Sequence, residues 1–313
     1  MEYAEKEAEE NLTVIEEFIL LGFSGLHNLQ GFLFGIFLII YMSILIGNGL
    51  IIVITKIDSG LKTPMYFFLG NFSFLEICYT SVTLPRMLAD LWTQKRNISF
   101  LACAVQTCFF FILGVAECLL LAVMAYDRYV AICKPLYYPL IMNHKVCVQL
   151  VVASWMIGVP VLIEQTYQIF SLNFCGPNKI NHIFCDASPL FKLACGDTYK
   201  IEISVHVVAQ LFILTPFLFI LASYIKIVTT ILKLPSTSGR SKAFSTCFSH
   251  LMVVGLFYGS GSIVYFQPKS GHSAGSVKVF ALFYTTVTPM FNPLIYSLRN
   301  KDVLAALRKL LPK

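Results

Sequence analysis

The chain has 313 residues, of which 57% are hydrophobic and only 13% are charged, and its mean hydropathy is +0.73. A chain this apolar is not a soluble globular domain of ordinary composition, and we expect it in a lipid bilayer. Its formal net charge is +6, which we attribute to the positive charge of one membrane face and not to nucleic-acid binding.

Seven apolar runs are long enough to cross about 30 Å of hydrocarbon, which takes roughly 20 helical residues. In chain order they are residues 32–55, 65–84, 100–126, 146–163, 203–225, 243–266 and 279–298. We therefore predict an all-α membrane protein, with a seven-transmembrane helix bundle over residues 29–299. Residues 300–313 follow it as a short amphipathic helix and tail.

The distribution of Lys and Arg sets the orientation of these spans. We assign 14 of the 23 basic residues, but only three acidic ones, to the face that contains residues 56–62, 127–145, 226–242 and 299–313. Positively charged loops stay in the cytoplasm, so the amino terminus is predicted to be extracellular and the carboxyl terminus cytoplasmic. The sequence thus indicates a multi-pass protein of the plasma membrane, with lipid around its bundle.

Residues 1–28 form the predicted extracellular tail, which is rich in glutamate near its start. This polar, acidic composition is typical of a solvated segment. Asn11 opens an Asn-Leu-Thr acceptor for N-glycosylation, and the predicted topology exposes it on the outer face. We expect a glycan at this position.

Polar side chains interrupt the first, second and third spans. Glu76 lies about 13 residues into the second span and Glu117 lies 11 residues before Arg128, so both fall roughly 16 to 20 Å from the cytoplasmic side. Two carboxylates at one depth are not comfortably both ionised. We expect them to share a proton or to hold a small cation such as sodium, with Asn48 and Asn292 as further oxygen ligands. Asn48, between two glycines, also suits a hydrogen bond between helices.

The third span carries three side chains of different chemistry on one face. Phe110 lies 18 residues before Arg128, which is five turns of a helix, and Glu117 lies within about 20° of the same line. Gly114 is about 40° away and would open space beside this stripe. The stripe suits a helix that connects an outer cavity to an inner switch. The alternative is a central helix whose polar residues only satisfy one another.

An acid and a base, Asp127 and Arg128, stand where the third span leaves the membrane, followed by Tyr129. Charges at this depth are costly unless they have a task. One interpretation is that Arg128 only adds to the positive cytoplasmic rim. The other is a latch, in which Asp127 holds Arg128 at rest and a rearrangement frees the guanidinium to meet a cytoplasmic partner.

Four cysteines fall on the predicted outer face. Cys103 begins the third span, and Cys175, Cys185 and Cys195 lie in a long loop of about residues 166–200. An oxidising compartment favours two disulfides among them. Their spacing alone leaves three pairings open.

The last two spans carry residues that suggest a cavity wall and a bend. One face of the sixth span has the i, i+3, i+4, i+7 spacing and consists of Tyr258, Gly261, Ser262 and Tyr265. This face suits either an inward cavity or plain helix packing. In the seventh span, Pro289 and Pro293 permit a bend, provided that groups such as Asn292 satisfy the freed backbone.

Several motifs together resemble a known family. They are Pro64-Met-Tyr-Phe-Phe-Leu69, Met124-Ala-Tyr-Asp-Arg-Tyr-Val-Ala-Ile-Cys133, Ser223-Tyr224, Lys242-Ala-Phe-Ser-Thr-Cys-Phe-Ser-His250, Phe257-Tyr-Gly259 and Pro289-Met-Phe-Asn-Pro-Leu-Ile-Tyr-Ser-Leu-Arg-Asn300. With seven spans and the three-cysteine loop, the chain resembles the odorant (olfactory) receptors, a group of rhodopsin-like, class A G-protein-coupled receptors. The resemblance covers all seven spans and the amphipathic helix.

The resemblance implies an odorant receptor that activates a stimulatory, cyclic-AMP-raising heterotrimeric G protein of the olfactory type. It also implies the disulfides Cys103–Cys185 and Cys175–Cys195. The family's second helix usually bears aspartate where this chain has Glu76, which puts the detailed cation geometry in question.

We expect a mostly apolar odorant pocket in the outer half of the bundle, lined by Phe110, Phe111, Gly114, Val208, Phe212, Tyr258, Gly261, Ser262, Tyr265 and Thr285. Phe110 stands at the place where amine receptors of the wider class A family carry an acid, so the resemblance disfavours a cationic amine as the ligand. The predicted switch and G-protein-coupling residues are Asp127, Arg128, Tyr129, Tyr224, His250, Asn292, Pro293 and Tyr296.

Two other functions stay open on the sequence. The carboxylates Glu76 and Glu117, with Asn292, would also suit an ion or proton pathway in a transporter or channel, although no internal repeat is visible. A receptor for an internal metabolite is the other alternative. No nucleophile, base and orienting residue recur at a catalytic spacing, so we do not predict an enzyme, and we predict no cofactor besides the candidate sodium ion.

Overall fold

The computed structural model describes residues 15–175, 177–233, 236–265, 274–299 and 301–310. The predicted glycosylation site at Asn11 lies outside these residues. The side chains of Ser262, Tyr265 and Tyr296, which belong to the predicted pocket and switch, are also outside the described part.

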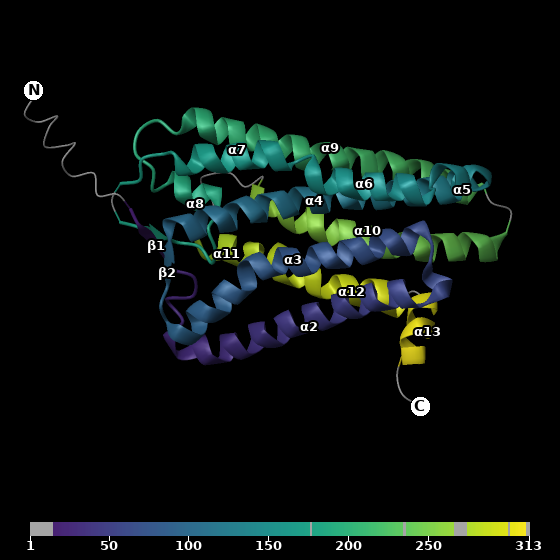
Figure 1. Cartoon of the computed structure of the whole chain (residues 1–313), viewed down its shortest axis with the longest axis horizontal. Coiled ribbons are helices and arrows are strands. Elements are labelled where there is room, and N and C mark those ends of the chain that lie inside the picture. The colour runs from purple at the N-terminus through teal and green to yellow at the C-terminus, as the bar shows by residue number, and fades with distance from the viewer. Residues whose placement is uncertain (1–14, 176, 234–235, 266–273, 300, 311–313) are drawn as a thin grey trace, which may run out of the picture.

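Long helices run side by side along the longest axis of the molecule (Figure 1). In chain order the crossings are α2 (Gln30–Ile57), α3 (Pro64–Thr93), α4 (Phe100–Cys133), α6 (His144–Met156) with α7 (Val159–Phe170), α9 (Tyr199–Leu232), α10 (Thr237–Tyr265), and α11 (Ala274–Leu282) with the π-helical turn η4 (Phe283–Val287) and α12 (Thr288–Arg299). The seven predicted spans thus form one helix bundle. Among the described residues, six of the crossings are long and apolar enough to span a membrane, and the seventh consists of α11, η4 and α12.

Local sequence explains where several helices begin. Ser99 caps α4 by accepting a hydrogen bond of 3.2 Å from the backbone N–H of Ala102, and Asn143 caps α6 by accepting one of 3.1 Å from Val146. Such side-chain acceptors satisfy N–H groups that the first turn leaves unpaired. Pro64 opens α3, where its missing N–H costs nothing.

The fourth crossing is divided near Gly158, just before Pro160, into α6 and α7. A proline removes one backbone donor and disfavours the helical conformation of the preceding residue, so a break is expected here. The second half continues as α7 to Phe170. The long loop therefore begins after Phe170, later than the predicted start near residue 166.

A small sheet covers one end of the bundle. Strand β1 (Glu17–Leu20) lies between β2 (Asn97–Ser99), to which it is antiparallel, and β3 (Lys179–Ile180), to which it is parallel. Phe18 on β1 is fully buried. The predicted tail over residues 1–28 is therefore not a solvated segment throughout, because its second half is built into the fold.

We call this end the disulfide end, because both disulfides lie beside the sheet. They join Cys103 to Cys185, with Cα atoms 5.5 Å apart, and Cys175 to Cys195, with Cα atoms 5.7 Å apart. The short helix α8 (Ala187–Phe191) follows in the same loop, and η1 (His27–Leu29) leads from the sheet into α2.

The opposite end, which we call the Arg128 end, contains the connections η2 (Ser59–Leu61), η3 (Pro135–Tyr137) and α5 (Tyr138–Ile141), and the last helix α13 (Lys301–Leu310). In α13, Val303 and Ala306 are buried whereas Arg308 and Lys309 are exposed. This is the amphipathic helix that the sequence predicts. Lys309 forms an ion pair of 2.8 Å with Asp58, which caps η2.

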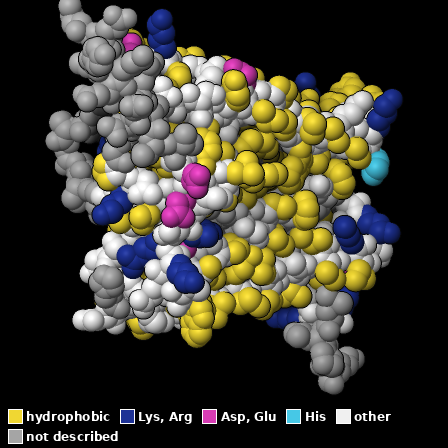
Figure 2. Space-filling model, turned by 60° about the vertical axis from the view of Figure 1, so that its left-hand side comes forward, with side chains coloured by type: hydrophobic (Ala, Val, Ile, Leu, Met, Phe, Trp, Pro, Cys, Tyr) yellow, Lys and Arg dark blue, Asp and Glu magenta, His cyan; other side chains and the backbone are white. Residues whose placement is uncertain are grey.

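Apolar side chains form a belt across the middle of the surface, and Lys and Arg lie toward its two ends (Figure 2). Large exposed side chains such as Ile39 on α2, Val152 on α6 and Leu211 on α9 contribute to this hydrophobic surface. A soluble protein would not expose so much contiguous apolar area. A lipid bilayer solvates such a belt, with the charged ends in the interfacial regions.

Candidate functional site

Phe110 stands at the centre of an aromatic cluster in the half of the bundle nearest the disulfides. Its ring centroid lies 5.3 Å from that of Tyr79 on α3, 4.8 Å from that of Phe184 in the long loop, and 6.1 Å from that of Tyr284 in η4. Its neighbour Phe111 is 6.3 Å away. Phe110 is only 3% exposed, so a ligand that touches it has to displace or rearrange one of these rings.

The other described pocket residues come from α4, α9, α10 and η4. Gly114 faces Tyr79, since a Cβ built on the glycine would lie 3.9 Å from the tyrosine ring. Thr285 is buried and donates a hydrogen bond of 2.7 Å to the Ala281 carbonyl. The remaining members differ in burial: Val208, Phe212 and Gly261 are half-buried and Tyr258 is buried.

A column of buried oxygen atoms lies below this cluster. Glu76, Glu117, Asn48 and Asn292 are each 1% exposed. The Asn292 side-chain amide donates a hydrogen bond to Glu76, and the carboxyl groups of Glu76 and Glu117 approach each other. The structure thus brings the predicted polar side chains of α3, α4 and α12 together. Among the described interactions, Asn48 of α2 has no contact with the two carboxylates.

Five oxygen atoms of this column lack a hydrogen-bond partner among the described residues. They are Oε2 of Glu76, both carboxyl oxygens of Glu117, and the side-chain oxygens of Asn48 and Asn292. Buried oxygens of this kind require a proton, a water molecule or a cation. The donor set is chemically suited to a hard cation such as sodium, because it contains only oxygen.

Asp127, near the end of α4, does not form the predicted ion pair with Arg128. Its Oδ1 instead accepts a hydrogen bond of 2.8 Å from the Tyr138 hydroxyl of α5, and no ion pair joins Asp127 to Arg128 in the described part of the chain. The physical reason is helical geometry, because consecutive residues point about 100° apart and do not face each other.

The charge of Arg128 acts on Asp127 in its own helix and also on His250 of α10 in the sixth crossing. Its Nε is buried and has no hydrogen-bond partner among the described residues. Tyr129, the third member of the motif, lies under the Lys134 ammonium, whose Nζ is 5.9 Å from the ring centroid. Arg128 is thus held by packing and long-range charge, not by a direct salt bridge.

Tyr224 on α9 and His250 on α10 form a polar contact between the fifth and sixth crossings. The Tyr224 hydroxyl lies 2.8 Å from Nδ1 of His250, and the two rings are stacked with centroids 5.7 Å apart. His250 is 1% exposed. The contact therefore links α9 and α10 next to Arg128, where the sequence predicts the switch.

The seventh crossing is irregular where the predicted bend lies. The π-helical turn η4 precedes Pro289, and Pro293 is buried against α2. A Cβ added to Gly47 would lie 3.0 Å from Cγ of Pro293. The glycine thus allows the first and seventh crossings to approach closely, beside the Asn292 side chain.

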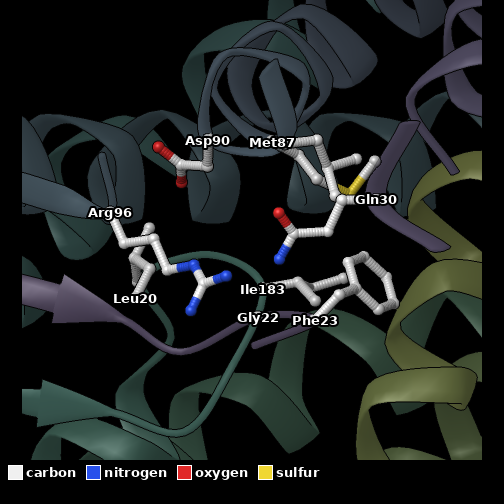
Figure 3. A pocket seen from close by; sticks show the side chains of 9 residues that line it. Leu20, Gly22, Phe23, Gln30, Met87, Asp90, Arg96 and Ile183 are labelled. Carbon is white, nitrogen blue, oxygen red and sulfur yellow. The ribbon is translucent and has the colours of Figure 1, made fainter. Parts of the chain in front are cut away.

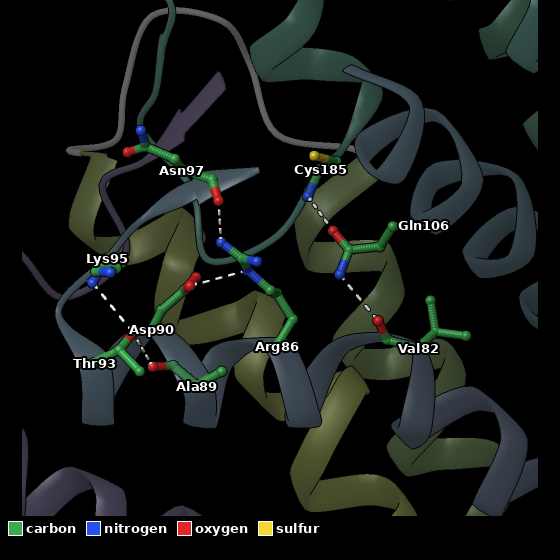
Figure 4. A network of polar contacts seen from close by, with 9 residues as sticks. All are labelled: Val82, Arg86, Ala89, Asp90, Thr93, Lys95, Asn97, Gln106 and Cys185. Carbon is green, nitrogen blue, oxygen red and sulfur yellow. Dashed lines mark hydrogen bonds and ion pairs between the residues drawn. The ribbon is translucent and has the colours of Figure 1, made fainter. Parts of the chain in front are cut away.

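The loops of the disulfide end are joined to the bundle by polar side chains (Figure 4). Gln106 donates a hydrogen bond of 2.9 Å to the Val82 carbonyl and accepts one of 3.0 Å from the Cys185 backbone N–H. Arg86 donates to the Asn97 carbonyl. These contacts fix the long loop, and with it Phe184, over the part of α4 nearest the disulfides.

Comparison with known proteins decides the family. The sequence model of the olfactory receptor family matches residues 37–313. The chain is 62% identical to olfactory receptor 10AG1 of Homo sapiens, over 95% of this chain and 99% of that protein, and 54% identical to olfactory receptor 10A4 of Homo sapiens, over 96% of each. The chain belongs to the olfactory receptor family.

The fold of this olfactory receptor is also that of a rhodopsin. The crystal structure of squid rhodopsin aligns with a TM-score of 0.73 at 19% sequence identity, over 92% of this chain and 81% of the rhodopsin. The receptor is thus a multi-pass, seven-transmembrane G-protein-coupled receptor. Its family is one of receptors, not of enzymes.

Sequence reasoning missed several residues of the receptor's site, among them the rings of Tyr79, Phe184 and Tyr284 around Phe110 and the polar residues Tyr138 and Gln106. Tyr138, the partner of Asp127, lies 11 residues away in a short helix after the third span, and nothing in its neighbourhood marks it. Gln106 gave a clearer signal, because it is an uncharged polar residue three positions after Cys103 in an otherwise apolar run. Such a side chain must find a hydrogen-bond partner when buried.

Proposed function

We propose that this receptor is a switch for a small, mostly apolar odorant, which it binds in the half of the bundle nearest the disulfide end. Binding activates a stimulatory, cyclic-AMP-raising heterotrimeric G protein at the Arg128 end. The disulfide end and the amino terminus would then be extracellular, as the excess of Lys and Arg at the Arg128 end supports.

The relation between Phe110 and Arg128 carries this proposal. Both belong to α4, both face the bundle interior, and they are separated by five helical turns. Phe110 contacts rings from α3, the long loop and η4, whereas Arg128 lies beside α10. A ligand that moves the rings around Phe110 therefore acts on a rigid helix whose other end adjoins the sixth crossing.

The composition of the Phe110 cluster indicates the ligand class. Ligand pockets are mostly apolar with a few polar groups that orient the ligand. Here, Phe110, Phe111 and Phe184 supply apolar rings, and Tyr79 and Tyr284 supply rings that carry a hydroxyl group. This arrangement favours an uncharged molecule with at most one or two hydrogen-bonding groups.

At the Arg128 end, activation would separate α10 from α9 and expose Arg128. The contact between Tyr224 and His250 would have to break or rearrange when α10 moves outward. Asp127 stays bonded to Tyr138, so the carboxylate does not follow the guanidinium. The docking surface for the G protein would then form from Arg128 and the exposed ends of α9 and α10.

A ligand panel with a cyclic AMP readout tests both halves of the proposal. For an odorant that activates the receptor, Phe110→Ala should weaken the potency by about tenfold or more, because an aromatic contact is lost. Phe109→Ala is the matched control, since Phe109 is 53% exposed on the outer surface of the same helix. If the odorant activated both variants with equal potency, the odorant would bind at a site other than the Phe110 cluster.

Arg128→Ala tests the coupling. At matched surface expression, this variant should lose the cyclic AMP response while Lys145→Ala, at an exposed cation of the same end, keeps it. A full response from Arg128→Ala would contradict the proposed switch. Calcium signalling without any rise in cyclic AMP would contradict the stimulatory G protein and leave the odorant pocket in place.

We also propose sodium as the partner of the buried oxygen column at Glu76 and Glu117. The purified receptor should unfold at a higher temperature in sodium chloride than in N-methylglucamine chloride, whose cation is too large to enter. Glu117→Gln removes one negative charge and should abolish the difference. Identical unfolding temperatures in the two salts for the unmodified receptor would rule out the ion.

A further inference from the structure

A small cavity of about 20 Å³ lies at the disulfide end, apart from the Phe110 cluster and the oxygen column. It is lined by the end of β1 and the segment that follows it, the first turn of α2, the last turns of α3, the connection between α3 and β2, and the loop after β3 (Figure 3). A single water molecule requires about 10 to 15 Å³ of such space. The cavity thus has room for one particle of the size of a water molecule or a halide ion.

Gln30 points into this cavity with an unsatisfied amide. Its side chain is only 3% exposed, and neither Nε2 nor Oε1 has a hydrogen-bond partner among the described residues. Whichever way the amide is turned, one N–H-bearing face and one carbonyl face are left without a protein partner. A buried amide without partners is costly, so the cavity is built to receive something that hydrogen-bonds.

Arg96 enters the cavity from the opposite side. Figure 3 shows its guanidinium and the Gln30 amide directed toward one another across the open space. Both groups carry N–H donors, and arginine has no acceptor. An acceptor placed between them would accept hydrogen bonds from the guanidinium and from the amide N–H at the same time.

The charges around the cavity favour an anion as that acceptor. Asp90 also lines the cavity, but it forms an ion pair with Arg86, with Nε and Oδ1 2.9 Å apart. Lys278 adds a further positive charge beside the cavity, where its Nζ donates a hydrogen bond of 2.8 Å to the carbonyl of Gly22. The charges of Arg86 and Arg96 both act on Asp90, and Lys278 is a further cation, so the charges of these four residues sum to a net positive value near the cavity.

We propose that this cavity is a binding site for a single chloride ion, held by Arg96 and the Gln30 amide. Its size excludes carboxylates and sulfate, and its charge disfavours a metal cation. The apolar side chains of Met87 and Ile183 form part of the remaining lining, and such apolar neighbours strengthen an electrostatic attraction relative to bulk water. The ion would join α2 and the connection between α3 and β2 to the segment after β1.

The purified full-length receptor provides the test, without any odorant. Its thermal unfolding midpoint is measured in sodium chloride and in sodium gluconate at equal ionic strength, so that sodium is constant. The midpoint should rise with chloride in a saturable way, because an ion that binds only the folded state stabilises it. Bromide should reproduce the rise and sulfate should not. Equal midpoints in chloride and gluconate, or an equal rise in sulfate, would overturn the proposal.

Two variants locate the effect. Arg96→Gln should remove the dependence of the midpoint on chloride, whereas Lys95→Gln removes the same charge from the neighbouring exposed position and should keep it. Gln30→Leu should weaken the apparent chloride affinity by about tenfold, since one hydrogen-bond donor is lost. A chloride dependence that is unchanged in Arg96→Gln would contradict the assignment. If that variant does not fold, the comparison of salts on the unmodified receptor still decides the question.

Discussion

The Tyr138 hydroxyl donates a hydrogen bond of 2.8 Å to Asp127, so the carboxylate next to Arg128 is held by a residue of α5 and not by its neighbour. Burial is the main cause that raises the pKa of Tyr138 above its ordinary range, and the charge of Asp127 adds to it. The phenol therefore stays protonated and remains a donor under all working conditions. This bond connects the end of the third crossing to the connection that follows it.

We predict that Tyr138→Phe lowers the stability of the receptor by about 1 to 3 kcal/mol, because it leaves a buried carboxylate without its donor. The thermal unfolding midpoint of the purified receptor measures the effect. Tyr137→Phe is the matched control, since Tyr137 is 61% exposed and its hydroxyl is free to bond with water. A Tyr138→Phe midpoint equal to that of the control would show that the bond contributes nothing.

A second prediction concerns the close approach of the first and seventh crossings. Gly47→Ala places a Cβ 3.0 Å from Cγ and 3.1 Å from Cβ of Pro293, and the proline ring has little freedom to move. We expect a loss of about 1 to 3 kcal/mol from overpacking. Gly49→Ala meets nothing within 4 Å and should be neutral or slightly stabilising, because alanine favours the helix. Chemical or thermal unfolding of both variants checks this, and an equally stable Gly47→Ala would contradict it.

A third prediction concerns acid. Burial of His182 in the long loop lowers its pKa below the ordinary value of 6.5, and the nearby Lys278 charge acts in the same direction, whereas Asp186 opposes them. The unfolded chain therefore binds a proton more readily than the folded one below about pH 6.5, so stability should fall as the pH drops from about 7 to about 5.

Asp186 contributes with the opposite sign at lower pH. Burial raises its pKa, so protonation favours the folded state and offsets part of the loss once the pH approaches the range of carboxyl groups. His182→Gln should flatten the slope of the unfolding midpoint between about pH 7 and pH 5. His206→Gln, at an exposed histidine of α9, should keep it. An unchanged slope in His182→Gln would assign the acid sensitivity to other groups.

The fourth prediction concerns the attachment of α13. The hydrogen bond from Lys309 is the main cause that lowers the pKa of Asp58, and the Gly60 N–H adds to it. A lowered carboxyl pKa means that the contact is fully present above about pH 4 and is lost only as the pH falls through the lowered value.

Lys309→Gln should therefore increase hydrogen–deuterium exchange in residues 301–310 at neutral pH, with little change elsewhere, because exposed ion pairs contribute little to global stability. Arg308→Gln is the control, since Arg308 is an exposed cation of the same helix. Equal exchange in the two variants would show that apolar packing of Val303 and Ala306 is sufficient to hold α13.

Much of this fold was predictable because a bilayer imposes strong rules. Each crossing had to be a long apolar helix. The first span, which ends before Lys56, and the third span, which begins at Phe100, could be read directly from their composition. One break was also visible, since Pro160 follows directly on the division of the fourth crossing, whereas Pro293 lies inside the continuous helix α12 and the π-helical turn η4 precedes both prolines of the seventh crossing. The pattern of 18 residues between Phe110 and Arg128 placed both on the interior side of α4, as the structure shows.

Other features depend on contacts between distant segments and were not visible in the sequence. Phe18 and Leu20 form too short an apolar run to identify a strand, and its partners β2 and β3 are equally short. Phe184 packs against Phe110 because of the path that the long loop takes, and this path could not be predicted from the sequence. Sequence motifs indicated which residues belong to the switch. That Tyr138 is the partner of Asp127 could not be predicted, because it depends on how α5 lies relative to α4.

The sheet at the disulfide end has a consequence for how the receptor is made. Glu17 of β1 is separated by 80 residues from Asn97 and by 161 residues from Asn178, to both of which it is hydrogen-bonded. Ribosomes synthesise the amino-terminal strand first, so it has no partner until the second crossing has emerged and no second partner until the fourth has emerged. Sheet closure is thus a late step in biogenesis, and a chain arrested before the long loop would expose Phe18 to the quality-control machinery of the cell.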